Sequence, residues 1–180
     1  MTALAIVFSC ILYLLGFICI PFRIIAAPAC SFLGLLILSF SHNDAGYPLL
    51  PVGSSLIFGW LCVTVLVTVA TLIQPAPVRD ARKGMGYIFI GALTGLAIGL
   101  LGFTITNSIG ALYAIMVICT AAGTFLGYLI FTNTPDGRRV RAGSGNFFSY
   151  LLAKGFPTAI TVMQAGVVLV LLIAMHTLIN

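Results

Sequence analysis

Apolar residues fill long, nearly uninterrupted runs of the chain, and polar residues gather in the short connections between them. Each run is roughly twenty residues long, the length that an α-helix needs to cross the ~30 Å hydrocarbon layer of a bilayer. A membrane barrel would instead show ~10-residue segments of alternating polarity. The pattern predicts an all-α integral membrane protein with about six transmembrane helices. We expect them at residues 2–21, 24–41, 54–73, 85–106, 108–131 and 158–178.

The region before the last predicted helix has a different pattern. Residues 146–179 form an apolar stretch that is longer than one crossing needs, and it contains Gly155, Phe156 and Pro157. A proline breaks or kinks the helix that precedes it. We therefore expect residues 146–156 to form a short interfacial or re-entrant segment ahead of the last helix.

The composition agrees with a membrane protein. Of the 180 residues, 61% are hydrophobic and 6% are charged, whereas soluble domains carry about 25% charged residues. The net charge is +5, but a basic surface for nucleic acid needs a soluble face, and the cations lie beside or between the apolar runs. We expect membrane lipid and no nucleic acid as a partner.

Basic residues occupy every second connection. Arg23 follows the first run, and further Lys and Arg residues lie in connections 74–84 and 132–146. The connections 41–53 and 104–108 contain no Lys or Arg. Cytoplasmic loops carry an excess of basic residues, so we expect the three basic connections in the cytoplasm and both termini outside.

The connection 74–84 divides the chain into two sets of three predicted helices. Because three is odd, the second set would enter the membrane in the opposite sense to the first, as in inverted-topology repeats. We therefore treat residues 1–180 as a single membrane domain that has candidate inverted halves at 1–73 and 85–179.

Small residues recur four apart on three of the predicted helices. Residues four apart lie on one face of a helix, and small residues let helix backbones approach closely in lipid. We expect glycine-zipper packing of the fourth and fifth helices, with the glycines facing each other or a second subunit. The alternative is that these stripes permit sliding or line a narrow path. The predicted packing residues are Gly91, Gly95, Gly99, Cys119, Gly123, Gly127, Gly155 and Ala159.

Four polar residues are candidates for contact with a solute or a lipid headgroup. Lys154 lies in the predicted interfacial segment. There we expect it either to bind an anionic headgroup or substrate, or to anchor the segment at the membrane surface. Arg23 lies in a tight turn, from which its side chain can reach the headgroups. Thr161 and Gln164 lie on the last helix, where polar side chains hydrogen-bond across helices or contact a solute.

The sequence contains no catalytic signature. It has no glutamate, and its three acidic residues are the scattered Asp44, Asp80 and Asp136. The five cysteines lie in apolar runs without a CxxC pair, so they form no disulfide framework or zinc pattern. We expect no enzyme activity, no cofactor and no metal.

The order of these elements resembles an uncharacterised bacterial glycine-zipper membrane family, the domain of unknown function 456. The matching pieces are "APACSFLGLLIL", "IQPAPVRDARKGMGYIFIGALTGLAIGLLGF", "GTFLGYLIF" and "RRVRAGSGNFFSYLLAKGF". The resemblance extends over residues 27–179. The family's Pro-Gly reads Pro28 and Ala29 here, and its Gly-Glu reads Gly127 and Tyr128. The resemblance implies the architecture and a location in a bacterial cytoplasmic (inner) membrane, with no established activity.

Three functions fit the predicted architecture. A small-solute permease or channel, which we favour, would need a polar cavity at mid-membrane bordered by Gln164, Thr161 or Thr94. A non-catalytic structural or assembly subunit, in a homo-oligomer or with another membrane protein, would have a closed core and an exposed glycine face. A lipid-headgroup enzyme would need an acid–base or metal constellation that the sequence lacks.

Overall fold

The computed structural model describes most of the chain. The described residues are 2–22, 24–42, 46, 48–50, 52–75, 78, 83–102, 108–141 and 144–179. Within these ranges all the regular elements are helices, and there is no strand. The predicted all-α class is therefore confirmed for this part of the chain. Arg23 lies outside the described residues.

Long apolar helices make up the body of the fold, and short helical segments join two of them. The long helices are α1 (Thr2–Phe22), α2 (Ala26–Phe40), α3 (Ser54–Ile73), α5 (Met85–Leu101), α6 (Ile109–Asn133) and α9 (Phe156–Ile179). The segments between α6 and α9 are α7 (Pro135–Arg141), α8 (Ser144–Tyr150) and the π-helical turn η2 (Leu151–Gly155). Each long helix coincides with one of the apolar runs.

The helices differ in length relative to a bilayer. Four stretches are long and apolar enough to cross one, namely Ala3–Phe22, Ser54–Ile73, Ile109–Asn133 and Phe147–Ala174. Helices α2 and α5 have 15 and 17 residues, which corresponds to about 23 and 26 Å at the α-helical rise. The fold is thus compatible with a helical membrane protein, and the six crossings stay a prediction.

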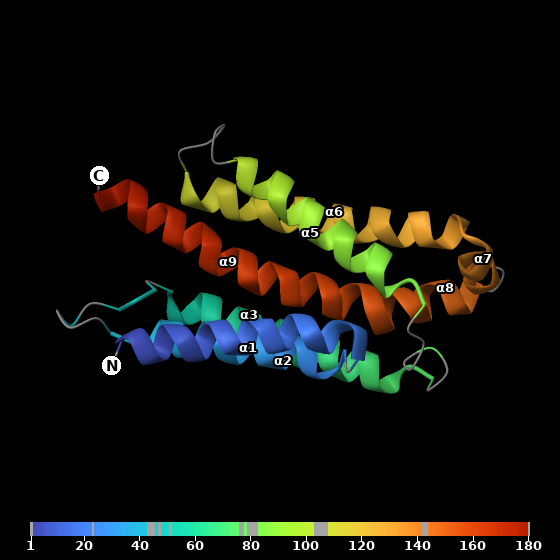
Figure 1. The fold of residues 1–180 in the computed structure, drawn as a ribbon, viewed down its shortest axis with the longest axis horizontal. Coiled ribbons are helices and arrows are strands. Elements are labelled where there is room, and N and C mark those ends of the chain that lie inside the picture. Colours follow the sequence, from blue (N-terminus) through green and yellow to red (C-terminus); the bar gives the residue numbers. More distant parts are fainter. Residues whose placement is uncertain are drawn as a thin grey trace.

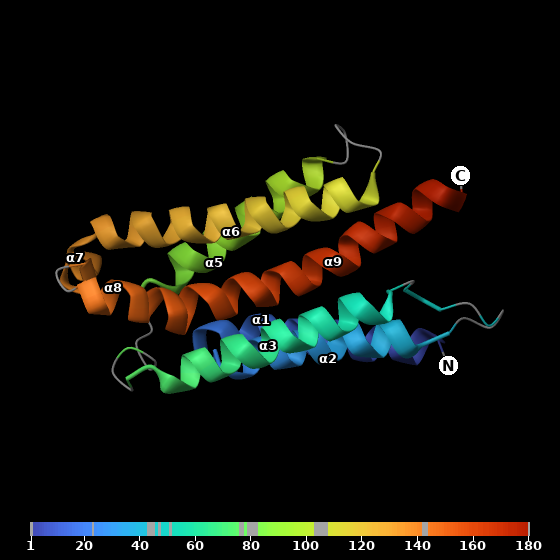
Figure 2. The same cartoon turned by 180° about the vertical axis from the view of Figure 1, so that it is seen from behind.

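Helix α9 lies at the centre of the bundle. It runs between a group formed by α1, α2 and α3 and a pair formed by α5 and α6 (Figures 1 and 2), and it contacts all five of these helices. In the 18 most apolar consecutive residues of the stretch that includes α9, 67% are buried, against 17%, 22% and 33% in the corresponding parts of α1, α3 and α6. Side chains of α9 therefore make up much of the core. The inverted halves at 1–73 and 85–179 stay a prediction.

The helix ends that border the basic connections lie together. The end of α1, the end of α3, the start of α5, and α7 with α8 all lie at one end of the bundle, and both chain termini lie at the other (Figure 1). We call the first of these the α7 end. The prediction that basic residues mark the cytoplasmic side assigns the α7 end to the cytoplasm.

The break predicted before Pro157 is wrong. Helix α8, the turn η2 and α9 follow one another without interruption, so residues 146–156 continue into the last helix instead of forming a separate segment. The Phe156 N–H donates to the Leu151 carbonyl, five residues back, as in a π-helix. Pro157 comes directly after this wide turn, and it has no N–H to donate. The wide turn thus lets the helix continue past Pro157 without a break.

Candidate functional site

Four buried polar side chains follow one face of the central helix. They are Lys154, which is 5% exposed, and Thr158, Thr161 and Gln164, which are all fully buried. Their spacings of four, three and three residues keep them on one side of a helix. We call these four residues the polar line.

Gln164 joins three helices through its side-chain amide. Its Oε1 accepts a hydrogen bond from the Ser31 hydroxyl of α2. Its Nε2 donates to Thr64 Oγ1 of α3 at 2.8 Å. Both hydroxyls are buried and also have backbone acceptors on their own helices, including Ala27 O for Ser31 and Trp60 O for Thr64. The Gln164 amide is therefore bonded on both sides. If it moves away, the Ser31 and Thr64 hydroxyls still have their backbone acceptors.

The two threonines of the polar line differ in their partners. Thr161 Oγ1 donates to the Pro157 carbonyl at 2.7 Å. Thr158 Oγ1 is buried and has no hydrogen-bond partner among the described residues. A buried hydroxyl without a partner costs about 1–3 kcal/mol on protein mutational scales. Thr158 is thus the polar-line residue whose hydrogen-bonding capacity the described structure leaves unused.

Lys154 is the charged residue of the polar line. The sequences of α1, α2, α3, α5 and α6, and of residues 147–174, contain no other Asp, Glu, Lys or Arg. A charged residue at the centre of a membrane helix costs about 2.5–3.5 kcal/mol on insertion scales, and such residues are usually functional. Lys154 lies in η2, and π-helical turns often occur at functional sites. The sequence prediction that singled out Lys154 placed it in a separate interfacial segment, whereas it lies within the continuous last helix.

The contact between α5 and α6 brings backbone against backbone. A Cβ atom added at Gly91 would lie 2.3 Å from the Gly123 carbonyl oxygen, and one at Gly95 would lie 2.2 Å from the Cys119 carbonyl oxygen. Gly127 comes equally close to the partner helix, with an added Cβ atom 2.2 Å from Tyr87 O, and at Gly99 the added atom would lie 2.7 Å from Met116 Cα. No side chain fits at these positions without moving a helix. The six residues predicted to pack on the fourth and fifth helices all lie at this contact, which Cys119 joins through its backbone.

The last two predicted packing residues lie elsewhere. Gly155 belongs to η2, and a Cβ added there would lie 2.6 Å from the Leu151 side chain of the same turn. Ala159 is buried in the main apolar core. These two residues therefore take no part in the contact between α5 and α6.

Two apolar grooves lie beside these features. The first, which we call the glycine groove, has a cavity volume of about 510 Å³ on the face of α5 and α6 that points away from α9. The second has a volume of about 570 Å³ and lies between α3, α6 and α9, where Trp60, Tyr113 and Met163 line it. Thr94 lines the glycine groove. Neither groove includes a residue of the polar line, which is closed off from both.

An aromatic cluster joins α8 to the end of α6 at the α7 end of the bundle. The ring of Tyr150 stacks on those of Tyr128 and Phe131, with centroids 5.7 and 5.5 Å apart. The Tyr128 hydroxyl donates to the Phe147 carbonyl at 3.0 Å, and the Tyr150 hydroxyl donates to the Lys83 carbonyl. These contacts hold the start of the last helix against the end of α6.

Sequence reasoning missed several of these residues. Ser31, Thr64 and Thr158 are ordinary small polar residues in apolar runs, and no local pattern separates them from Thr68 or Ser39, which bond their own helices. Among the described residues, no three His, Cys, Asp or Glu side chains come together.

Comparison of the chain with protein-family models, with curated proteins and with solved structures finds no match. The resemblance to a glycine-zipper family stays a prediction.

Proposed function

We propose that this chain is a small-solute permease whose path follows the polar line and is closed in the described conformation. The observation that carries the proposal is the burial of Lys154, Thr158, Thr161 and Gln164 along one face of the central helix. Polar and charged residues inside a membrane bundle are costly, and they commonly mark solute or ion pathways. The proposal keeps the predicted bacterial cytoplasmic membrane and the termini outside.

The helices on the two sides of α9 can move separately, because they are held together in different ways. The pair α5 and α6 is joined by direct backbone contact, so it moves as one unit. The contact of α9 with α2 and α3 includes two side-chain hydrogen bonds of Gln164. Hydrogen bonds between membrane helices average about 0.6 kcal/mol each, so releasing both costs on the order of 1 kcal/mol. The two hydrogen bonds therefore add little to the cost of opening, which also separates the apolar packing of α9 against α2 and α3.

The chemistry of the polar line favours a neutral or weakly anionic solute. Two hydroxyls and one amide provide both donors and acceptors, and Lys154 adds a positive charge nearer the α7 end. A positive charge beside a narrow path disfavours cations.

Labelling of single cysteines from water tests the proposal. The five native cysteines are first replaced by alanine, and Thr161→Cys is compared with Val162→Cys in liposomes. Val162 is the next residue on α9, is also fully buried and lies off the polar line. We expect a membrane-impermeant maleimide to label Thr161→Cys at least 5-fold faster than Val162→Cys. Equal rates at the two positions in the folded protein would overturn the proposal.

A second candidate function is a non-catalytic assembly subunit, as a homo-oligomer or with another membrane protein. It is favoured by the closed core, because the described grooves are apolar and Gln164 is bonded on both sides. This function predicts no labelling at either position and a stable complex after purification. The labelling experiment therefore separates the two candidates.

A further inference from the structure

The glycine groove has the shape and lining of a site for a hydrocarbon chain. Glycines of α5 and α6 form its floor, and its walls include Ile90, Ile98, Leu126 and Ile130, which are 62%, 61%, 57% and 57% exposed. Along α5 it extends from Tyr87 to Ile98, about 16 Å at the α-helical rise. The groove is therefore long, narrow and apolar.

The one hydroxyl that lines the groove outside its aromatic end is satisfied locally. Thr94 Oγ1 donates within its own helix, to Ile90 O at 3.0 Å and to Gly91 O at 2.9 Å. The Thr94 hydroxyl therefore needs no hydrogen-bond partner from a molecule bound in the groove. Among the residues that the structure describes, no charged one lines the groove.

One end of the groove lies at the α7 end of the bundle, near the start of the basic helix α7. Tyr87 and Ile130 line this end, and the Tyr87 ring contacts that of Phe131 at a centroid distance of 6.2 Å. Helix α7 then folds tightly over the end of α6, so closely that a Cβ atom at Gly137 would lie 2.0 Å from the Phe131 carbonyl oxygen. The basic residues of α7 thus lie at the same end of α6 as this end of the groove.

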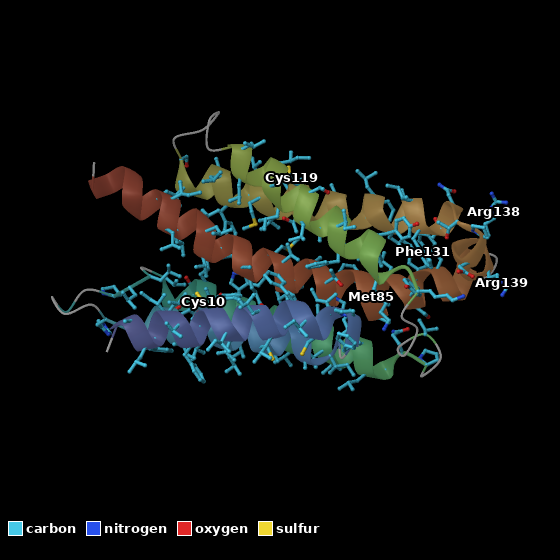
Figure 3. The ribbon with its side chains drawn as sticks, in the orientation of Figure 1. Cys10, Met85, Cys119, Phe131, Arg138 and Arg139 are labelled. Carbon is cyan, nitrogen blue, oxygen red and sulfur yellow. The ribbon has the colours of Figure 1, made fainter. Side chains whose placement is uncertain are left out.

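Arg138 and Arg139 supply positive charge at this end. Both are exposed and project from the α7 end, beyond Phe131, whereas Cys119 marks the contact of α5 and α6 deeper in the bundle (Figure 3). Asp136, the acidic residue of α7, pairs with Lys83 at 3.1 Å. The aspartate is thus engaged by a lysine and does not offset the charges of the two arginines.

We propose that the glycine groove binds one acyl chain of an anionic phospholipid whose phosphate lies at Arg138 and Arg139. An apolar groove that ends in exposed arginines matches the apolar tail and negative headgroup of such a lipid. Arginine binds phosphate through paired hydrogen bonds, and basic residues near the membrane surface attract anionic lipid headgroups. This site is independent of the proposed path along α9.

The charge of the α7 end disfavours a second copy of the chain as the occupant. Two copies inserted in the same sense would bring their α7 ends to the same side of the membrane. Their arginines would then lie close together, and like charges at an interface are unfavourable.

Retention of phosphatidylglycerol against phosphatidylcholine, measured by native mass spectrometry, tests the site. The two lipids are supplied with identical acyl chains to the purified full chain in detergent. We expect the native protein to retain phosphatidylglycerol at least 5-fold better. Equal retention of the two lipids would overturn the proposal.

Two variants separate the tail from the headgroup. Ala122 lines the groove and is exposed, so Ala122→Phe fills the groove without entering the helix contact. We expect it to lower retention of both lipids, whereas Val65→Phe on the exposed face of α3 leaves retention unchanged. The double variant Arg138→Gln and Arg139→Gln should bring the ratio of the two lipids to about one, and the matching lysine double variant should keep most of the preference.

The same measurement identifies other occupants. If the native protein is dimeric and Ala122→Phe makes it monomeric with lipid retention unchanged, a second copy fills the groove and the lipid proposal is overturned. If the glutamine double variant retains the native lipid ratio, the headgroup does not lie at α7, and the proposal is again overturned.

Discussion

Two helix contacts in this bundle differ in kind: the contact between α5 and α6, and the contact of α9 with α2 and α3. Helices α5 and α6 meet mainly through glycines, at which the main chain of one helix touches the main chain of the other. Helix α9 meets α2 and α3 through buried side chains, including the Gln164 amide between Ser31 and Thr64. Main chains in contact have no rotamers with which to adjust, whereas a side-chain bridge can be remade. We therefore expect the contact between α5 and α6 to stay fixed, and the contact of α9 with α2 and α3 to be able to rearrange.

The largest expected effect comes from adding one methyl group to the glycine interface. In Gly95→Ala the new Cβ would lie 2.2 Å from the Cys119 carbonyl oxygen, so the helices must separate. Overpacking of this kind typically costs 1–3 kcal/mol, occasionally more, and we expect about 3 kcal/mol. Thermal unfolding in detergent, followed by fluorescence of the single tryptophan, measures the loss.

Gly86→Ala is the matched control on the same helix. A Cβ atom at Gly86 meets no atom of the described residues within 4 Å. Alanine is favoured over glycine inside a helix by up to about 1 kcal/mol, so we expect unchanged or slightly raised stability. If both substitutions had the same effect, the close approach of α5 and α6 would be wrong.

Breaking the side-chain bridge should cost less. Gln164→Leu removes both amide hydrogen bonds but leaves Ser31 and Thr64 with their backbone acceptors. We expect a loss of about 1–2 kcal/mol in the free energy of unfolding, below that of Gly95→Ala. A double-mutant cycle with Thr64→Val should give a coupling energy of about 0.6 kcal/mol. A coupling energy near zero would show that Gln164 and Thr64 do not interact.

The smallest effect distinguishes the two threonines of the polar line. Thr158→Val replaces a buried hydroxyl that has no partner among the described residues, so we expect stability to rise by up to about 1 kcal/mol. Thr161→Val loses the hydrogen bond to the Pro157 carbonyl and should lower stability by about 0.5–1 kcal/mol. The sign of the difference, measured by the same thermal unfolding, is the test. Equal losses would mean that Thr158 has a partner after all.

The helical architecture follows closely from the sequence. The run predicted at 54–73 is α3, and the run predicted at 2–21 is α1 with one more residue. Apolar length is a local property that each segment carries by itself, so these boundaries need no knowledge of neighbours. The stripe of glycines was predictable for the same reason, since a four-residue spacing places them on one face.

The behaviour of the chain at Pro157 did not follow from the sequence. The usual effect of proline predicts a break, but the preceding turn widens to a π-helix and the helix continues. This correction moves Lys154 from a separate segment into the last helix. A proline rule describes the regular α-helix, and it does not state which other backbone geometry the surrounding packing will stabilise.

The sequence by itself determined that this is a helical, membrane-compatible chain with a small-residue face on its fourth and fifth apolar runs. Only the tertiary structure decided that α9 lies at the centre and that Gln164 meets Ser31 and Thr64, 133 and 100 residues away along the chain. The physical reason is that helix formation and side-chain spacing depend on near neighbours. Which faces meet depends on how all the helices share the limited buried space.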